Sequence, residues 1–298
     1  MPDENSRWIE RYRNIFGVKL SSGDQTQRLT SSVCRPTDCL RWKESVLSSI
    51  SRVHPTVMDR KAWEWGFIAQ ALLERGMLGV GRKGLGFACG KEPLASIFAS
   101  YGCDIVATDA PPYIIEKTDW ESSGQHGNTA EDLFFSDFLN QAAFDQQVTF
   151  QYVDMKNIPE SLDGSADFLW SSCAMEHLGS IHDAKDFVYR AMRCLKPGGV
   201  AVHTTEINLK SSLETKTFGT TCVLRTIDFI EMAEYLHFNG HQVESLDFRL
   251  DGSEYDDTFA QFGSHGEAPT EPHFKLAFSK CLLTSFGLIA YKGKENNV

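Results

Sequence analysis

The sequence predicts an α/β protein with an open, mostly parallel sheet preceded by a helical region. From about residue 82 onward, short apolar runs alternate with amphipathic segments, the pattern of strands joined by crossover helices. Before that point, apolar residues recur at helical spacing and no strand is expected. We therefore expect a helical cap over residues 1–80 and a second unit over residues 81–298.

Five strands are expected in the parallel part of the sheet, and helices over residues 94–101 and 184–195 fit between them. The expected strands span residues 83–88, 104–109, 148–154, 166–172 and 199–206.

The chain after the fifth strand predicts a different connection. A helix over residues 227–238 ends at an Asn-Gly pair, and strands follow at 242–248 and 282–293. The connection over 249–280 is rich in Gly, Asp, His and Pro and too irregular for a crossover helix. We therefore expect the last strand to be antiparallel.

The helical region contains two amphipathic patterns, over residues 6–16 and over residues 59–76, the second ending at Gly76. Trp63, Glu64 and Trp65 lie on the second helix. Such a helix can cover a bound ligand, but aromatic residues on a helix more often belong to the core, and we favour the core.

Composition excludes several classes of protein. Hydrophobic residues make up 42% of the 298 residues and the net charge is -11, which argues against a general nucleic-acid binder. The eight cysteines form no CxxC pair and indicate buried free thiols. No signal-like or membrane-spanning run is found, so we expect a cytoplasmic protein without membrane insertion.

The stretch "GLGFACGKEPLASIF", residues 84–98, resembles a glycine-rich nucleotide loop between a strand and a helix. Gly86, Ala88 and Gly90 alternate after the strand, and small residues let backbone approach a ligand closely. By itself the signal is weak, because glycines in such turns often serve packing alone.

Two aspartates end the next strands. Asp109 comes about twenty residues after the loop, where a carboxylate can accept hydrogen bonds from both hydroxyls of a ribose; alone, it reads better as a turn or helix-capping residue. Asp154 is followed by Met155, and the pair suits adenine, because the acid can accept from the amino group while Met155 packs on the ring. The alternative is a solvated acid on a loop.

The order of these features and of "DFLWSSCAMEHL…LKPGG" resembles the class I S-adenosylmethionine-dependent methyltransferases over residues 82–292. The resemblance implies a Rossmann-like seven-stranded sheet with an antiparallel last strand and S-adenosyl-L-methionine as cofactor. It implies donor contacts at Gly86, Ala88, Cys89, Gly90, Glu92, Asp109, Ala110, Asp154, Met155, Ser172 and Cys173.

Two residues depart from the family pattern. Ala88 replaces a usual glycine, which costs little if its φ is negative. Glu92, before Pro93, replaces the last glycine; a carboxylate there would repel a dinucleotide's phosphates but suits the cationic methionine end of the donor.

The "GxEPL" pattern is also similar to a bacterial subgroup associated with polysaccharide and lipopolysaccharide biosynthesis. This resemblance implies O-methylation of a sugar or another small hydroxylated metabolite, with a small-molecule or glycan acceptor. The acceptor's identity and the oligomeric state stay open.

Candidates for chemistry lie after the fourth and fifth strands. His177 follows the fourth strand, and Glu206 ends the fifth, better placed than His203, which suits the core. Gln125 and His126 are candidate substrate-binding residues on a loop after Asp109, and His273 is a weaker candidate; all three also suit surface loops. No HExxH spacing is found and no metal is predicted, although a divalent metal held by Glu206 with histidines stays an alternative.

Two other functions stay open. An NAD(P)-dependent oxidoreductase or sugar epimerase would share the sheet, but Glu92 and the antiparallel last strand argue against it. A non-catalytic relative would explain Ala88 and Glu92, but the acids at 109 and 154 argue against lost function.

Overall fold

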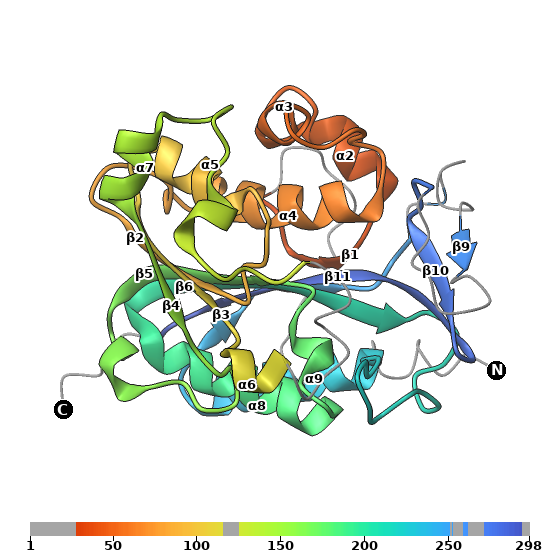
Figure 1. The fold of residues 1–298 in the computed structure, drawn as a ribbon. Helices are drawn as coiled ribbons and strands as arrows, with labels where there is room; N and C mark the ends of the chain where they lie inside the picture. The colour runs from red at the N-terminus through yellow and green to blue at the C-terminus, as the bar shows by residue number, and fades with distance from the viewer. Residues whose placement is uncertain (1–27, 116–124, 251, 253–258, 262–270, 294–298) are drawn as a thin grey trace.

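The computed structural model describes residues 28–115, 125–250, 252, 259–261 and 271–293. They form three layers, with a mixed sheet between two layers of helices (Figure 1). The predicted helix over residues 6–16 lies outside the described residues. Within the described chain the sheet has eleven strands, more than the seven expected.

One half of the sheet is parallel. Its strand order places β2 between β3 and β5, so the chain reverses its direction of travel across the sheet at the β2–β5 pair. Ligands of open α/β sheets bind at this switch point, beyond the carboxyl ends of the strands. In sheet order, the strands are β4 (Val148–Tyr152), β3 (Asp104–Asp109), β2 (Lys83–Phe87), β5 (Ala166–Ser172) and β6 (Leu195–Asn208).

The other half is organised by β11 (Cys281–Tyr291), which runs antiparallel to β6. This pairing reaches Asn208, so β6 is longer than predicted and Glu206 lies before its end, not at it.

The additional strands have two to four residues, too few for an alternating pattern to be recognised. The predicted strand at 242–248 is two short strands with different partners, and the expectation of no strand before residue 80 is wrong, because Ser31–Val33 pairs with β11. The short strands are β1 (Ser31–Val33), β7 (Gln242–Val243), β8 (Leu246–Asp247), β9 (Phe259–Gln261) and β10 (Lys275–Phe278).

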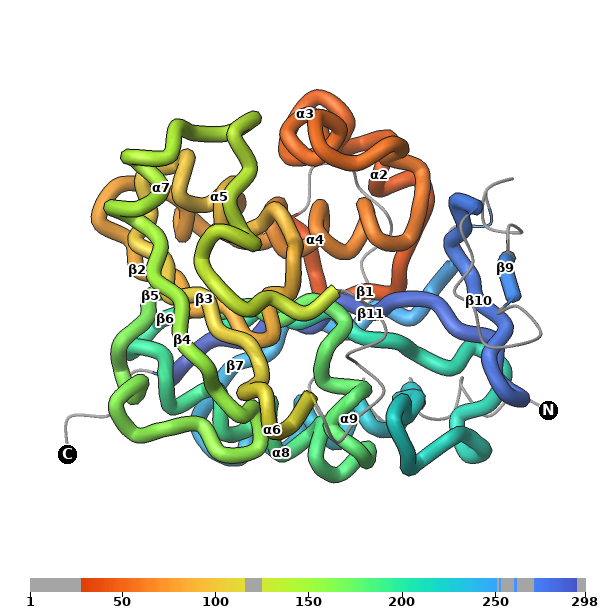
Figure 2. Tube along the Cα trace, in the orientation of Figure 1, coloured from red at the N-terminus to blue at the C-terminus, as the bar shows by residue number. Residues whose placement is uncertain are grey.

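Helices cover both faces of the sheet (Figure 2). One face carries α2 (Pro36–Trp42), α3 (Val46–Ile50), α4 (Arg60–Glu74), α5 (Leu94–Ser100) and α7 (Gln141–Gln147), and the other carries α6 (Pro112–Ile115), α8 (Ile181–Ala191) and α9 (Thr226–Phe238). Single 3-10 turns occur at Ala130–Leu133, Glu160–Leu162, Met175–His177 and Met192–Cys194.

Local signals explain the helix ends. Asp59 accepts a hydrogen bond from the Ala62 N–H at 2.7 Å and begins α4, and Gly76 follows it with a φ of +64°. The α8 helix starts earlier than expected, because the Ser180 hydroxyl accepts from the Asp183 N–H at 3.0 Å.

The N-terminal helices share a hydrophobic core with the sheet. Trp63 and Phe67 of α4 are buried in the cluster that also contains Phe98 and Trp170, on one side of the sheet. A second cluster on the other side is built around Phe187 and Phe229. The N-terminal helices and the sheet therefore share one hydrophobic core, and the expected boundary at residue 80 lies just before β2.

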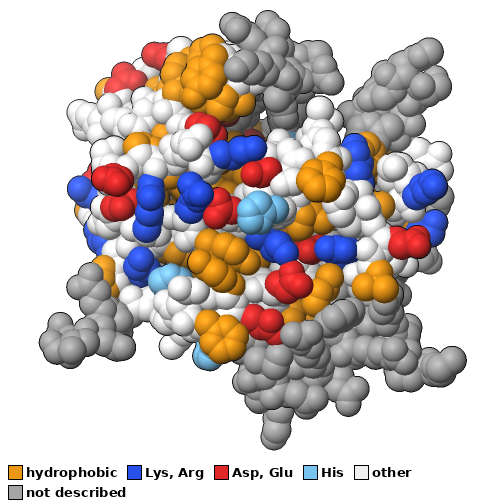
Figure 3. Space-filling view, turned by 90° about the horizontal axis from the view of Figure 1, so that it is seen from below, with side chains coloured by type: hydrophobic (Ala, Val, Ile, Leu, Met, Phe, Trp, Pro, Cys, Tyr) orange, Lys and Arg blue, Asp and Glu red, His pale blue; other side chains and the backbone are white. Residues whose placement is uncertain are grey.

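The surface and the helices carry two further observations. The face seen in Figure 3 mixes Lys and Arg with Asp, Glu and hydrophobic side chains, instead of gathering one sign of charge. Among the helices that the structure describes, none has the length and apolar character needed to cross a membrane.

The contact between α4 and β11 gives a test of the fold. A Cβ atom at Gly287 would lie 2.2–2.5 Å from ring atoms of Phe67, closer than van der Waals contact allows. We expect Gly287→Ala to lower the free energy of unfolding by about 1–3 kcal/mol, measured by urea denaturation. Phe67→Leu makes room, so the double variant should be more stable than the sum of the two single effects predicts. Simple additivity would contradict the contact.

Candidate active site

A cavity of about 390 Å³ lies at the carboxyl ends of β2, β3 and β5, at the switch point of the sheet. Its volume suits a small-molecule site. Eleven of the predicted site residues line it: Ala88, Gly90, Glu92, Asp109, Ala110, Gln125, His126, Met155, Ser172, Cys173 and His177.

Four predicted site residues are not among the residues that line the cavity. A Cβ at Gly86 would meet the Cys89 Sγ at 2.3 Å, so this glycine serves packing and Cys89 is buried beside it. The Asp154 carboxylate holds its own turn, accepting from the Lys156 N–H at 2.8 Å and from the Asn157 amide. Glu206 contacts α4 instead, as described below.

Two non-glycine residues at the cavity wall have left-handed backbone. Ala88, after β2, has a φ of 47°, and Cys173, after β5, has a φ of 43°. The condition for a small cost, a negative φ at Ala88, is therefore not met, and the substitution costs about 1–2 kcal/mol of strain. Such strain gathers at functional sites, where surrounding structure enforces it.

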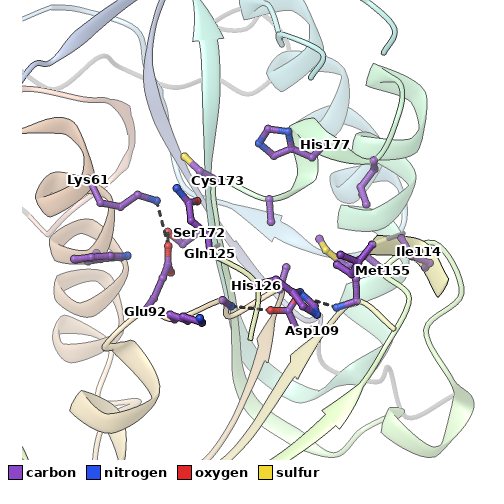
Figure 4. Close-up of a pocket in the computed structure, with 18 residues that line it drawn as sticks. Lys61, Glu92, Asp109, Ile114, Gln125, His126, Met155, Ser172, Cys173 and His177 are labelled. Carbon is purple, nitrogen blue, oxygen red and sulfur yellow. Dashed lines mark hydrogen bonds and ion pairs between the residues drawn. The ribbon is translucent and has the colours of Figure 1, made fainter. Parts of the chain in front are cut away.

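Glu92 lies at one end of the cavity (Figure 4). Its Oε1 accepts hydrogen bonds from Lys61 Nζ at 3.2 Å and Ser172 Oγ at 3.1 Å. Its Oε2 is buried without a hydrogen-bond partner among the described residues. Burial raises the pKa of Glu92, although Lys61 and the Trp65 indole act against this.

Asp109 lies at the other end, held by backbone. Its Oδ2 accepts from the N–H groups of Gly90 at 3.0 Å and Gly127 at 2.9 Å, and its Oδ1 accepts from the Ala110 N–H at 2.7 Å. The His126 Nδ1 lies 3.1 Å from Oδ1. Burial raises the pKa of Asp109 despite these donors.

Residues 125–127 lie directly on the glycine loop. The Gln125 carbonyl accepts from the Lys91 N–H at 3.0 Å, and a Cβ at Gly90, whose φ is +57°, would come within 2.8 Å of this oxygen. The loop needs glycine at position 90 for both reasons. The two predicted substrate residues therefore border the same cavity as the glycine loop.

The Asp109 end also has apolar walls. Met155 is buried, while Ile114 and Ile115 of α6 are half-buried, and all three line the cavity with Leu178. Figure 4 places Ile114 and Met155 beside Asp109 and His126. The cavity thus joins a charged end to an end that suits a flat, apolar ring.

His177 lines a third side, in the turn after β5. Its Nδ1 lies 2.9 Å from the Thr220 carbonyl oxygen, which can only accept, so Nδ1 carries the proton and Nε2 is an acceptor. Burial lowers the pKa of His177 to about 4, which keeps the ring neutral at physiological pH.

Behind Cys173 lies a buried ionic cluster that was not foreseen. Arg60 Nη1 contacts Glu64 Oε1 at 3.0 Å, Glu206 Oε1 at 3.2 Å and Ser285 Oγ at 3.1 Å. Lys61 bridges Glu64 Oε2 at 3.0 Å to Glu92. The available signal was the spacing of Arg60 and Lys61 before Glu64 on one helix.

Opposing effects set the protonation of this cluster. Burial alone would raise the pKa of Glu64, but Lys61 and Arg60 lower it to about 2. Burial raises the pKa of Glu206, and Arg60 acts against it. Glu176, which accepts from Thr205 Oγ1 at 2.8 Å, has its pKa raised to about 8 by burial and by Glu206.

The remaining candidates are spread over the fold. His203 is buried, with Nδ1 2.8 Å from Ser171 Oγ, as expected of a core histidine. Trp63 is core, whereas Trp65 lines the cavity. His273 is half-buried and bonds to the Glu271 carbonyl. Across the described residues, no three potential ligands are placed to hold a metal ion.

The residues fit S-adenosylmethionine. Glu92 Oε2 and His126 Nε2 are buried cavity-lining polar atoms with no hydrogen-bond partner in the described chain, so a ligand with hydrogen-bonding groups would satisfy both. The donor has an ammonium group at one end and ribose hydroxyls toward the other.

The raised pKa of Glu176 predicts a pH dependence of stability. Near pH 7, the folded protein keeps a proton that the unfolded chain, with a carboxyl pKa near 4.5, has released. Stability therefore falls as the pH rises from 6.5 toward 8, by up to about 1.4 kcal/mol per pH unit. His177 and His203, whose pKa values are lowered to about 4 and 3, act in the opposite direction, and their effect fades as the pH rises above the unfolded histidine pKa of 6.5.

We expect Glu176→Gln to flatten this dependence. Urea unfolding at pH 6.5, 7.0 and 7.5 should give a steeper loss of stability for the unsubstituted protein than for the variant. Parallel slopes would show that Glu176 is already ionised at neutral pH.

Comparisons with known proteins agree with this site. Residues 85–203 match the family model described as a methyltransferase domain. A search of curated proteins gave no match.

Solved structures give distant likenesses. A protein described as a sarcosine dimethylglycine methyltransferase from Galdieria sulphuraria is 19% identical, with a TM-score of 0.36; the match covers 69% of this chain and only 61% of that one. A SAM-dependent methyltransferase from Methanosarcina mazei is 14% identical, with a TM-score of 0.43, and the match covers 75% of this chain and 98% of that one. Phosphoethanolamine N-methyltransferase 2 of Haemonchus contortus is 17% identical, with a TM-score of 0.41, and the match covers 70% of this chain and 45% of that one. Similarity this distant carries no argument about the acceptor.

The matched segment contains the glycine loop, Asp109, Met155 and His177, and thus most of the cavity wall. Residues 85–203 therefore match a methyltransferase domain, and the cavity that they border fits S-adenosyl-L-methionine.

Proposed function

We propose that the protein transfers a methyl group from S-adenosylmethionine to a hydroxyl of a sugar or another small hydroxylated metabolite. The observation that carries the proposal is the cavity at the switch point, which has a carboxylate with an unsatisfied oxygen at one end and apolar walls at the other. The bound donor supplies an electrophilic methyl group on a sulfonium.

Glu92 and Lys61 hold the methionine end in this proposal. Glu92 Oε2 accepts from the ammonium group, and Lys61, already 3.2 Å from Glu92 Oε1, faces the carboxylate. The same carboxylate disfavours the alternative NAD(P) site, because it would lie against pyrophosphate oxygens. Asp109, His126 and Met155 take the adenosine end.

The proposed acceptor site lies on the side of Cys173 and His177. His177 is neutral and presents Nε2 as an acceptor, which suits removal of a proton from a hydroxyl. Arg60 Nη1 lies 4.0 Å from Cys173 Sγ and 3.2 Å from Glu206 Oε1. Arg60 therefore connects Glu206 to the cavity wall at Cys173. The enzyme's contribution is to align the hydroxyl with the methyl group and to accept its proton.

A glycan or nucleotide-sugar acceptor is supported by the "GKEPL" loop alone, residues 90–94, through its similarity to the polysaccharide-associated subgroup. The structure adds Lys91, an exposed side chain that lines the cavity beside this loop. Positive charge there suits an acceptor that carries phosphate or carboxylate.

The donor assignment is tested by isothermal titration calorimetry with S-adenosylhomocysteine, NAD and NADP. We expect S-adenosylhomocysteine alone to bind, and Glu92→Gln to weaken it by about 10- to 100-fold, the loss expected for a charged hydrogen bond. Asp104→Asn is a matched control at the other end of β3 and should bind normally. Tight binding of NAD, or a failure of all three ligands to bind, would contradict the proposal.

The proton acceptor is tested with His177→Asn and Glu206→Gln. Asparagine still donates to the Thr220 carbonyl but lacks the Nε2 position, so kcat should fall by about 10²–10⁴ while donor affinity stays constant. Release of S-adenosylhomocysteine would be followed with a panel of free sugars, nucleotide sugars and small phenols. Activity lost only in Glu206→Gln, with thermal melting and S-adenosylhomocysteine affinity unchanged, would assign the proton to Glu206, and unchanged activity in both variants would exclude both residues.

A further inference from the structure

The cavity has a corner, between α4 and the glycine loop, where two polar atoms of opposite character lack partners. Trp65 and Glu92 both line the cavity, and their Nε1 and Oε2 atoms are buried without a hydrogen-bond partner in the part of the chain that the structure describes. An indole N–H can only donate and an ionised carboxylate can only accept, so the two roles are fixed. Buried polar atoms in this state cost free energy unless a ligand completes them.

The two groups are neighbours that do not bond to each other. The Trp65 indole is among the groups that lower the pKa of Glu92, which places it near the carboxylate. The hydrogen bonds of Glu92 nevertheless go to its other oxygen, which accepts from Ser172 Oγ at 3.1 Å and Lys61 Nζ at 3.2 Å. A ligand that brings one donor and one acceptor side by side would complete both unpartnered atoms at once.

Helix α4 presents Trp65 and Lys61 together. They are four residues apart, hence on one face of the helix, and Lys61 Nζ lies 5.7 Å from the centre of the Trp65 ring. The Trp65 ring also meets the His54 ring edge to face, with 5.2 Å between the ring centres. His54 Nε2 lies 2.8 Å from Asp59 Oδ2, and Asp59 begins α4. The indole is thus held by its own helix and by the segment before it.

The amino-acid end of a ligand matches this corner. An α-ammonium group and an α-carboxylate are bonded to the same carbon, so the ammonium group can donate to Glu92 Oε2 while the carboxylate accepts from Trp65 Nε1. Lys61 supplies a positive charge beside both side chains. A phosphate could also accept from the indole, but it would then lie against the Glu92 carboxylate and be repelled.

We infer that the indole N–H of Trp65 donates a hydrogen bond to the carboxylate at the methionine end of the donor, and that Trp65 makes the site selective for donors that keep this carboxylate. The inference rests on the proposed donor site, in which Glu92 takes the ammonium group. It adds to that site a residue from outside the matched segment 85–203. A ligand contact also explains why this tryptophan, expected in the core, is half-buried at the cavity wall.

One substitution and one ligand analogue isolate the hydrogen bond. Trp65→Phe removes the N–H and keeps an aromatic ring beside Lys61. Affinity would be measured by isothermal titration calorimetry for S-adenosylhomocysteine and for its decarboxylated analogue, S-adenosyl-3-thiopropylamine, which keeps the ammonium group and lacks only the carboxylate. Glu92→Gln is the matched contrast, because it removes the charge that meets the ammonium group of both ligands. Thermal melting would verify that each variant is folded.

We expect Trp65→Phe to bind S-adenosylhomocysteine about tenfold more weakly, the effect of one hydrogen bond to a charged group. For the decarboxylated analogue, the variant and the unsubstituted protein should bind equally, because the hydrogen bond is absent from both complexes. Glu92→Gln should weaken the binding of both ligands. A loss of packing in Trp65→Phe would weaken both ligands alike, so an effect on one ligand alone separates the hydrogen bond from a structural role.

Three results would overturn the inference. An equal loss for the two ligands in Trp65→Phe would mean that the indole acts by packing or through Glu92. Unchanged affinity for S-adenosylhomocysteine would mean that no such bond forms, and tighter binding would mean that the ring obstructs the site. Failure of the unsubstituted protein to bind S-adenosylhomocysteine is a separate result, which removes the donor assignment and this inference with it.

Discussion

The buried carboxylate of Glu64 is the interaction on which the arrangement of the site depends. It is completely buried on α4, where Arg60, Lys61 and the Ser285 hydroxyl surround it. Removing one partner would leave an uncompensated charge in the interior, so each of these side chains is needed for the others to stay buried. Arg60 extends it to Glu206 on β6, and Lys61 extends it to Glu92 at the cavity. The helix before the sheet, the antiparallel strand and the donor loop are thereby held in one geometry.

Backbone strain marks the place where this geometry is used. Ala88 and Cys173 follow neighbouring parallel strands, both have positive φ, and both line the cavity. Gly90 has the same sign of φ and faces the Gln125 carbonyl. Each turn bends sharply because the chain must leave the sheet and make room for a ligand at the switch point. Two positions where glycine would be relaxed carry other residues, so the surrounding contacts must outweigh about 1–2 kcal/mol at each.

The sequence predicts the long elements well and the short ones poorly, for a physical reason. The strand ending at Asp109 and the helix around Phe187 bury a repeating apolar pattern, which is visible without knowledge of partners. The strand Ser31–Val33 has one apolar residue and exists because it pairs with β11, some 250 positions later. The length of β6 depends on β11 in the same way. Most of the cavity residues were predicted because they follow strands in a recognisable order. Arg60 and Lys61 were missed because their partners come from distant strands and loops.

The case of Asp109 extends this reasoning from placement to role. An acid after the second strand suggests a direct contact with ribose, but the number of donors around a carboxylate is a property of the folded chain. Here the Gly127 N–H donates to Asp109, and the Nδ1 of His126 lies 3.1 Å from its Oδ1. Glu92 shows the converse, because a residue that looks like a defect in the loop retains one unsatisfied oxygen in the cavity. Polar atoms without partners therefore indicate where a ligand completes this site more directly than the motif does.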